Sequence, residues 1–442
     1  MSFRSGRSTD AWHRSRRRAG VDVYLLPAVI GGGLGDIEEV LAAGRRLARA
    51  GFRIRLYRRS AHPLPRAVDG PWDWPPHRRV RRLHPAARAA LTITPAWGVS
   101  AAPRRPGPLG HPGPWAEEIA DIERAYGADW VLHISLEEFA RTLGARAETR
   151  ERLREGGVRA RAIPPRLALA QRRGEVDVYR AAYERFRAFD RPNVLALFAT
   201  FERSRSFARE FPQAVQTGPL WPNRYRPVRF RIPRNRVAGR QWVWYASPAS
   251  AERIAPEVLR GLATLRPRVH LWVRSSRPWT SVPADPHLTR ADRPVGPTAW
   301  RRRFARADLR IVTGSRTLLE ALEIGGPFLY FNGVLGSGSS ARRHRPEKID
   351  ALERFGRRRG VPGSLLRDLA RFARGEDIEG VVRRIARRPT GWDRLSRLAL
   401  RSAFAPPFDD AGSLIVAVAR TLERRRGDAP GVVRWARQRA NS

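Results

Sequence analysis

The sequence predicts an α/β protein with two domains. A chain of 442 residues is too long to fold around a single hydrophobic core. Two stretches far apart in the chain share one pattern, in which a short apolar strand leads through a glycine-containing turn into an amphipathic helix and then into a second strand. This pattern is typical of a βαβ unit, whose two strands pair in a parallel sheet.

The βαβ unit in the second half of the chain covers residues 304–331. It predicts a strand over 309–313, a Gly-Ser turn, a helix that ends at Ile324 and a strand over 328–331. The amides that open such a helix have no partner within it, so they can bind an anion such as a diphosphate. Glu320 follows one turn later, where a carboxylate can accept hydrogen bonds from ribose hydroxyls.

The spacing of residues in this unit carries a longer signature, made of Ala307, Asp308, Gly314, Ser315, Thr317, Glu320, Ala321, Gly325 and Pro327. It resembles the donor-nucleotide signature of glycosyltransferases with the two-domain B-type fold, nearest to the peptidoglycan N-acetylglucosaminyltransferase and UDP-glycosyltransferase group. The resemblance implies two Rossmann-like domains that face each other across a cleft. A nucleotide-sugar donor, with a UDP-sugar as first choice, would bind to the second domain. An unidentified acceptor, for which a lipid-linked molecule is one option, would bind to the first.

The same resemblance nominates the donor-binding residues. At the start of the helix they are Gly314, Ser315, Arg316, Thr317 and Glu320. Loops elsewhere in the second domain add Ser247, Ser250, Gly333 and Glu347. The chain has no Asp-x-Asp pair of the kind that metal-dependent glycosyltransferases use, so we expect no metal and no other cofactor. Helix N-termini and cationic side chains, with Arg316 as a candidate, would instead neutralise the leaving diphosphate.

The first half of the chain opens with the other βαβ unit. Val21–Ile30 is a near-continuous apolar run, as expected for a strand buried on both faces of a parallel sheet. A glycine-rich loop follows, in which Gly32, Gly33 and Gly35 would let a ligand approach the backbone closely. This loop is similar to the glycine loop with which the N-terminal domains of B-type glycosyltransferases open.

Asp36 is the candidate catalytic residue. In the resemblance to the peptidoglycan transferase it takes the place of a histidine in the glycine loop, where a carboxylate would act as general base toward the acceptor hydroxyl. Asp36 can equally cap the helix that starts here, because a carboxylate at a helix N-terminus accepts hydrogen bonds from the free amides. Both roles stay open, with Glu137 and Glu138 at a later strand end as further candidates for the base.

The composition along the chain predicts five segments. They are a basic disordered arm over 1–20, an acceptor domain over 21–222, a Pro- and Arg-rich linker over 223–240, a donor domain over 241–390 and C-terminal helices over 391–442. No apolar run approaches the roughly 18 residues that cross a bilayer, and the basic N-terminus contains no apolar stretch. The sequence therefore predicts a cytoplasmic protein, with peripheral contact to an anionic membrane as an option.

The formal net charge of +43 comes almost entirely from arginine, because Lys348 is the only lysine among 85 basic residues. Such a surface attracts nucleic acids, anionic lipids and nucleotide phosphates. The arginines are spread along the whole chain, so a general bias in composition explains them equally well. The chain has no cysteine, which excludes disulfides, thiolate catalysis and cysteine-bound metals.

The sequence leaves three rivals to a glycosyltransferase. A nucleotide-sugar hydrolase on the same fold would bind water in the place of the acceptor. A nucleic-acid-binding protein would use the arginine-rich surface, and its affinity would fall steeply with salt. A binding protein without activity would hold the donor and leave it unchanged.

Overall fold

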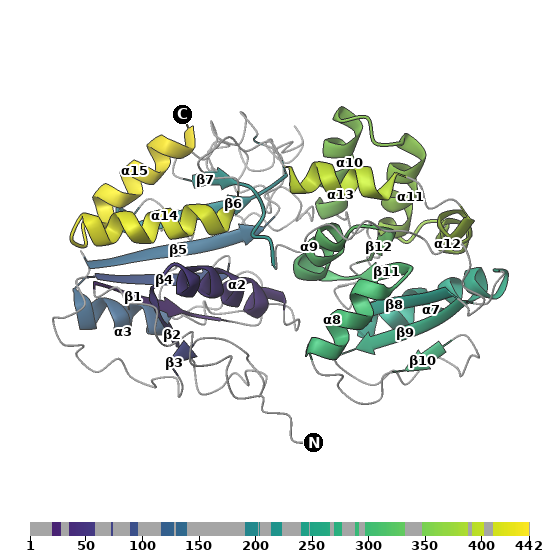
Figure 1. The fold of residues 1–442 in the computed structure, drawn as a ribbon, viewed down its shortest axis with the longest axis horizontal. Helices are drawn as coiled ribbons and strands as arrows, with labels where there is room; N and C mark the ends of the chain where they lie inside the picture. The colour runs from purple at the N-terminus through teal and green to yellow at the C-terminus, as the bar shows by residue number, and fades with distance from the viewer. Residues whose placement is uncertain are drawn as a thin grey trace, which may run out of the picture. The chain divides into compact units, whose positions relative to one another are not determined.

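The computed structural model of the chain divides into two compact α/β units (Figure 1). The first unit takes in the described parts of residues 1–30, 36–220 and 403–442, and the second unit those of 31–35 and 221–402. The structure describes residues 20–27, 35–57, 72–73, 89–95, 116–127, 130–138, 191–201, 203, 214–222, 240–246, 248–265, 269–275, 288–290, 297–331, 347–387, 391–401 and 410–441. Among these residues, no helix combines the length and the apolar character needed to span a bilayer.

The first unit is built on seven parallel strands in the order β3-β2-β1-β4-β5-β6-β7. The strands are β1 (Val21–Leu25), β2 (Arg53–Leu56), β3 (Trp72–Asp73), β4 (Ala89–Pro95), β5 (Val131–Glu138), β6 (Val194–Ala199) and β7 (Ala214–Thr217). The chain adds β2 and β3 on one side of β1 and then crosses to the other side for β4 to β7, which is the order of Rossmann-type sheets. β1 and β4 are buried along their whole length, as their apolar runs predict.

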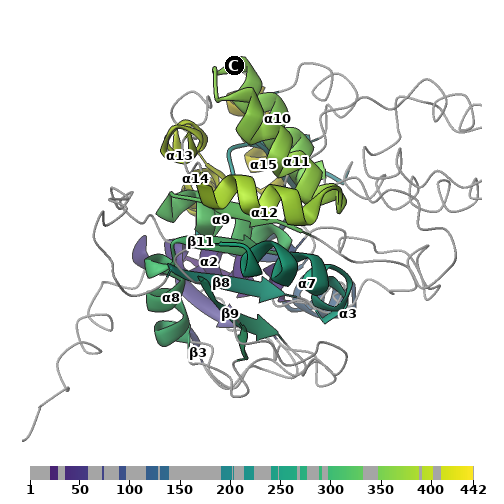
Figure 2. The same ribbon diagram turned by 90° about the vertical axis from the view of Figure 1, so that its right-hand side faces the viewer.

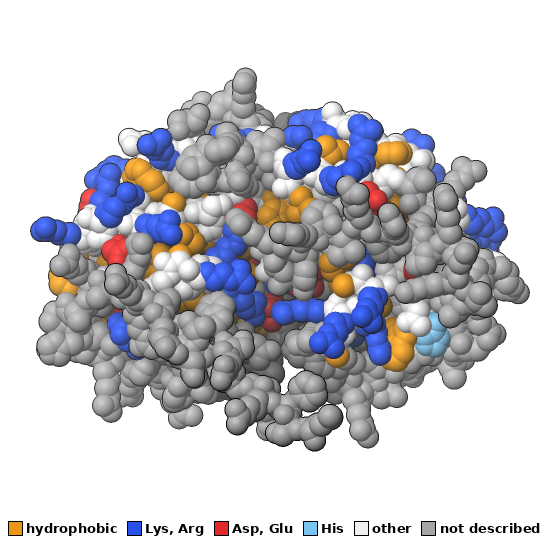
Figure 3. Space-filling view, in the orientation of Figure 1, with side chains coloured by type: hydrophobic (Ala, Val, Ile, Leu, Met, Phe, Trp, Pro, Cys, Tyr) orange, Lys and Arg blue, Asp and Glu red, His pale blue; other side chains and the backbone are white. Residues whose placement is uncertain are grey.

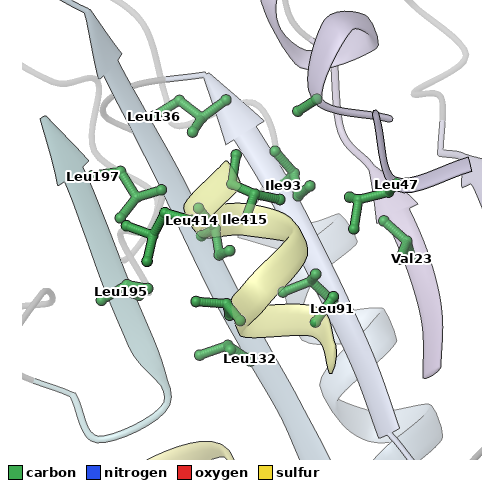
Figure 4. Close-up of a cluster of buried hydrophobic side chains, with 14 of the residues drawn as sticks. Val23, Leu47, Leu91, Ile93, Leu132, Leu136, Leu195, Leu197, Leu414 and Ile415 are labelled. Carbon is green, nitrogen blue, oxygen red and sulfur yellow. The ribbon is translucent and has the colours of Figure 1, made fainter. Parts of the chain in front are cut away.

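The described part of this unit contains four helices, and the last two of them complete its core. They are α2 (Gly35–Arg49), α3 (Ala116–Tyr126), α14 (Ala411–Arg424) and α15 (Ala429–Asn441). Leu414 and Ile415 of α14 lie among sheet residues that include Leu91, Leu132 and Leu197 (Figure 4). The C-terminal segment is therefore part of the hydrophobic core that the sheet begins.

Polar contacts fix the start of α14 against α2. Asp410 caps α14 by accepting a hydrogen bond from the backbone amide of Ser413 at 2.7 Å. Arg46 of α2 donates to the same carboxylate through Nη1 at 2.6 Å. Burial raises the pKa of Asp410, but the charge and hydrogen bond of Arg46 outweigh it and hold that pKa below its usual range. The cap is thus also a buried ion pair between distant segments.

The second unit is built on five parallel strands in the order β10-β9-β8-β11-β12. The strands are β8 (Arg240–Ala246), β9 (Val269–Ser275), β10 (Leu288–Arg290), β11 (Leu309–Val312) and β12 (Phe328–Tyr330). The helices are α7 (Pro248–Ala263), α8 (Pro297–Arg306), α9 (Gly314–Ile324), α10 (Glu347–Arg358), α11 (Gly363–Arg374), α12 (Ile378–Arg387) and α13 (Trp392–Leu400). As in the first unit, the chain adds strands on one side of its first strand, β8, and then crosses to the other side of it for β11 and β12. Helices α7 and α8 lie on opposite faces of the sheet (Figure 2).

The division of the chain differs from the predicted segments at the C-terminus. The sequence predicts one helical segment over 391–442, whereas α13 belongs to the second unit and α14 and α15 to the first. An amphipathic helix buries its apolar face on the sheet that it meets, and its own residues do not specify which sheet that is. Besides the short stretch 31–35, the chain passes from the first unit to the second at residues 220–221, close to the predicted end of the acceptor domain at 222. The predicted arm and linker lie outside the described residues, apart from Gly20 and Arg240.

A buried arginine joins the interior strand β11 to the ends of two helices. Arg310 is fully buried, and its Nε donates to the carbonyl of Phe304 at 2.7 Å. Its Nη2 donates to Ala305 and its Nη1 to Gly325, each at 3.0 Å. Burial lowers the pKa of Arg310 to about 9, while Asp308 opposes the shift, so the side chain stays a cation at neutral pH. The cation satisfies carbonyls at the C-terminal ends of α8 and α9, where helix dipoles favour positive charge.

We expect Arg310→Met to destabilise the second unit by at least about 2 kcal/mol, because three buried carbonyls lose their donor at once. The free energy of unfolding would be measured by denaturant titration. Arg302→Met is the control. Arg302 is an exposed arginine on α8, one of the two helices that Arg310 bonds to, and its loss should change stability by no more than about 0.5 kcal/mol. Equal stabilities of the two variants would show that the carbonyls do not need Arg310.

Candidate functional site

The topology of the second sheet marks one position for a ligand. The chain leaves β8 for β9 and β10 on one side, and it later returns to form β11 and β12 on the other side. In open α/β sheets, ligands bind at the carboxyl ends of the two strands where the order reverses, which here are β8 and β11. Helices α7 and α9 start directly beyond these two strands, so both present their N-termini at this edge. The predicted donor site at the start of α9 lies at this switch point.

The first turn of α9 leaves its amides available. Thr313 is the N-cap residue and has an extended backbone, but its side chain makes no capping hydrogen bond. Its hydroxyl oxygen is instead buried without a hydrogen-bond partner among the described residues. Gly314 has a φ of 78°, which favours glycine, and a Cβ placed there would meet no atom of the described residues within 4 Å. The backbone at this turn is therefore open to a close approach.

Arg316 adds a buried, incompletely bonded cation to the same turn. The residue is only 6% exposed, and its Nε donates to Glu320 Oε1 at 3.3 Å. Both of its Nη atoms are buried and have no hydrogen-bond partner in the part of the chain that the structure describes. Buried polar groups are almost always paired, and leaving a charged donor unpaired is costly. An anionic ligand at the N-terminus of α9 would supply the missing acceptors.

Four of the site residues that the sequence nominates lie together at the start of α9. Gly314, Arg316, Thr317 and Glu320 all lie in its first two turns. Thr317 is held by its own hydroxyl, which donates to the carbonyl of Thr313. Thr313 was not among the predicted site residues, although its position at the strand end, directly before a glycine, is a signal for an N-cap.

Other residues of the signature serve the fold. Asp308 accepts a hydrogen bond from the backbone amide of Gln241 at 2.7 Å, which joins the starts of β11 and β8. Gly325 ends α9 with a φ of 79° and gives its carbonyl to Arg310. The signature thus combines predicted ligand-binding positions with positions that hold α9 on the sheet.

Several predicted donor residues stay untested by the structure. Ser315, Ser250 and Glu347 lie in the first turns of α9, α7 and α10, with side chains outside the described part of the chain. Ser247 and Gly333 also lie outside it. Their contribution to the site remains a prediction.

The predicted glycine loop follows β1, the first strand of the first unit. Gly32 and Gly33 lie outside the described residues, and Gly35 and Asp36 begin α2. The order of the first sheet reverses between β1 and β4, so α2 starts at the switch point of that sheet. The side chain of Asp36 is not among those described, so its roles as general base or helix cap both remain predictions.

The first unit also contains a buried network that resembles a catalytic triad. With the His133 ring neutral, the hydroxyl of Thr92 donates to Nδ1, and Nε2 donates to Glu123 Oε1 at 2.8 Å. Thr92 and His133 are almost completely buried, so no substrate reaches the hydroxyl. Burial raises the pKa of Glu123, but hydrogen bonds from His133 and Asn193 and the charge of Arg191 lower it to about 2. We interpret the network as a structural link between β4, β5 and α3.

Neither a metal-binding cluster nor a dedicated basic patch marks the site in the described part of the chain. Among the described residues, no group of three or more His, Asp or Glu side chains is arranged to hold a metal ion. Basic side chains are distributed over the visible surface of both units, interspersed with apolar and uncharged side chains (Figure 3). The distribution fits a general use of arginine better than one dedicated patch.

Comparisons with known proteins give similarity in structure only. No protein-family model matches the chain, and no curated protein sequence matches it. UGT2 of Phytolacca americana, solved with UDP-2-fluoro-glucose and pterostilbene, gives a TM-score of 0.50 at 9% identity and covers 92% of this chain and 100% of its own. For a UDP-glucosyltransferase from Polygonum tinctorium the TM-score is 0.46 at 11% identity, with 96% and 99% covered. For MurG of Acinetobacter baumannii it is 0.33 at 12% identity, with 86% and 99% covered. The likeness to UGT2 and the strand orders confirm the predicted fold class, an α/β chain with two Rossmann-like units.

We expect His133→Gln to change how the stability of the first unit depends on pH. Burial lowers the pKa of His133 below its usual 6.5. On acidification this histidine is therefore protonated in the unfolded chain before it is protonated in the folded protein. Stability that is fully present above about pH 6.5 is therefore lost as the pH falls, by at most about 1.4 kcal/mol per pH unit. The free energy of unfolding between about pH 7 and pH 5 should fall more steeply for the wild type than for the variant. Parallel curves would mean that His133 takes up its proton equally in both states.

Proposed function

We propose that the protein transfers a sugar from a nucleotide-sugar donor, with a UDP-sugar as first choice, to an acceptor that carries a hydroxyl group. The donor diphosphate would bind at the N-terminus of α9 in the second unit. Three features support this proposal: the switch-point position of α9, the donor signature in the sequence, and the fold likeness to a protein crystallised with UDP-2-fluoro-glucose. The observation that carries it is the buried guanidinium of Arg316 with two unpaired nitrogen atoms.

The chemistry of the first turn of α9 suits a leaving diphosphate. As the bond between sugar and diphosphate breaks, negative charge grows on the diphosphate oxygens, and prepositioned donors stabilise it. The free amides of the turn, the Thr313 hydroxyl and the Nη atoms of Arg316 are such donors. Glu320 would accept from the ribose hydroxyls while its other contact, with Arg316, holds its orientation. This arrangement would let the reaction proceed without a metal ion.

The remaining predicted residues complete the proposed reaction. Ser247, Ser250, Gly333 and Glu347 would contact the donor from neighbouring loops and helix starts. Asp36, directly after the predicted glycine loop, would remove the proton from the acceptor hydroxyl as it attacks the sugar. A lipid-linked acceptor and contact with an anionic membrane belong to the proposal as options, because the positive charge of the chain favours both.

Arg316→Met should separate binding from stability. The variant keeps an apolar stem in the buried position and removes the unpaired donors, so we expect the affinity for UDP to fall at least about tenfold. Without ligand its free energy of unfolding should change little, because the loss of the ion pair between Arg316 Nε and Glu320 and the removal of two unsatisfied Nη donors act in opposite directions. Calorimetric titration with UDP and denaturant unfolding measure the two quantities.

Arg302→Met, at an exposed arginine of α8, is the matched control for the loss of one positive charge and should bind UDP as the wild type does. UDP at about a hundred times its dissociation constant should stabilise the wild type by about 2.7 kcal/mol. Unchanged UDP affinity in Arg316→Met would remove Arg316 from the site. Absence of UDP binding to the wild type would refute the proposed function.

Asp36→Asn should distinguish the general base from the helix cap. Asparagine caps a helix about as well as aspartate but cannot accept the proton of the acceptor hydroxyl. We expect turnover of a UDP-sugar against a panel of hydroxyl acceptors to fall at least about 100-fold, with UDP affinity unchanged. Turnover at the wild-type rate would leave Asp36 as a cap only, and free sugar formed without any acceptor would favour hydrolysis.

A further inference from the structure

A second cation lies on the same edge of the second sheet as the N-terminus of α9. Arg274 is the residue before the last of β9, and in the sheet register it pairs with Tyr245, which holds the same position in β8. The guanidinium of Arg274 lies 5.2 Å from the ring centroid of Trp300 and 6.0 Å from that of Tyr245. Two aromatic rings therefore hold a positive charge at the carboxyl end of the sheet.

The contacts of Arg274 leave its hydrogen-bonding capacity unused. Among the described residues it forms no ion pair, and its side chain is half-buried. Aromatic rings contact the faces of a guanidinium and leave the N–H groups at its edge free. The Tyr245 and Trp300 rings contact each other at 6.0 Å, so the surface under Arg274 is continuous. Such a side chain is oriented in advance and ready to bind an anion with its edge.

The distance to α9 suits one ligand with two phosphates. β8 separates β9 from β11, and adjacent strands lie about 4.8 Å apart, so Arg274 starts about 10 Å from the end of β11. Register pairs Ile311 with Trp244 and Arg274 with Tyr245, which places Arg274 level with the end of β11. An arginine side chain spans most of that gap, while Arg316 and the α9 amides act from the other side. The two arginines can thus hold the two phosphates of one diphosphate between them.

We propose that Arg274, held on Tyr245 and Trp300, is the second diphosphate-binding cation of this site and makes it selective for nucleoside diphosphates over monophosphates. The inference rests on the proposed function, because it assigns a further contact to the same donor. It places one phosphate on Arg316 and the α9 turn and the other on Arg274. A nucleoside monophosphate can use only one of these two positions.

The second sheet supplies a matched control for this role. Arg303 of α8 also stacks on an aromatic ring, with its guanidinium 3.4 Å from the centroid of Trp272. Trp272 lies two residues before Arg274 on β9, farther from the carboxyl edge. Arg274→Gln and Arg303→Gln therefore remove the same kind of cation–π contact and the same charge, but only the first change affects the proposed site.

The experiment measures the affinities of UDP and UMP, and of pyrophosphate and phosphate, by calorimetry for the wild type and both variants. We expect Arg274→Gln to reduce the affinities for UDP and pyrophosphate about tenfold and to leave those for UMP and phosphate nearly unchanged. Arg303→Gln should behave as the wild type with all four ligands. Arg274→Lys, which keeps the charge but loses the planar fork, should recover part of the diphosphate preference.

The outcomes separate this inference from the proposed function. If the wild type binds UDP and Arg316→Met does not, but Arg274→Gln keeps the full preference for UDP over UMP, Arg274 is a packing residue and the inference fails alone. Equal losses in Arg274→Gln and Arg303→Gln would also overturn it, because they would trace the effect to net charge. Absence of UDP binding to the wild type would end both proposals. Unfolding curves without ligand identify any variant that fails to fold, and Arg274→Lys then carries the test.

Discussion

The second unit depends on one buried guanidinium. Arg310 lies on the interior strand β11 and gives its three hydrogen bonds to Phe304, Ala305 and Gly325, at the C-terminal ends of α8 and α9. The N-terminus of α9 lies at the carboxyl end of β11 because the helix follows that strand directly. The hydrogen bond from Arg310 to Gly325 holds the other end of the same helix. The interaction that stabilises the fold thus also holds the helix that carries the candidate site.

Two buried arginines of this unit, Arg310 and Arg316, differ in how many of their nitrogen atoms have a hydrogen-bond partner. Arg310 has carbonyl partners for each of its nitrogen atoms, as a buried cation requires. Arg316, in the first turn of α9, has a partner only at Nε, and its Nη atoms are buried without a hydrogen-bond partner in the described structure. Buried donors without acceptors lower stability and persist where a ligand completes their hydrogen bonds. The contrast between them is what makes Arg316 a marker of a site.

Arginine side chains also pack against aromatic rings in the second unit. Several guanidiniums lie over aromatic rings, among them Arg303 over Trp272, Arg274 over Trp300 and Arg359 over Phe355. These contacts use the flat, weakly hydrated faces of arginine, which lysine lacks. A chain with one lysine and many arginines can therefore bury positive side chains against its aromatic residues and still expose a large net charge.

The sequence by itself determined the class of fold and the two βαβ units on which the site prediction rests. Apolar runs and glycine turns act locally, so β1, β11, β12 and the helix α9 between the last two could be predicted from the sequence, and Gly314, Arg316 and Glu320 could be nominated as site residues. Tertiary structure decided what depends on distant partners. The assignment of α14 and α15 to the first sheet, the unpaired state of Arg316 and the closeness of Arg274 to Tyr245 and Trp300 follow from contacts between segments that no local pattern encodes.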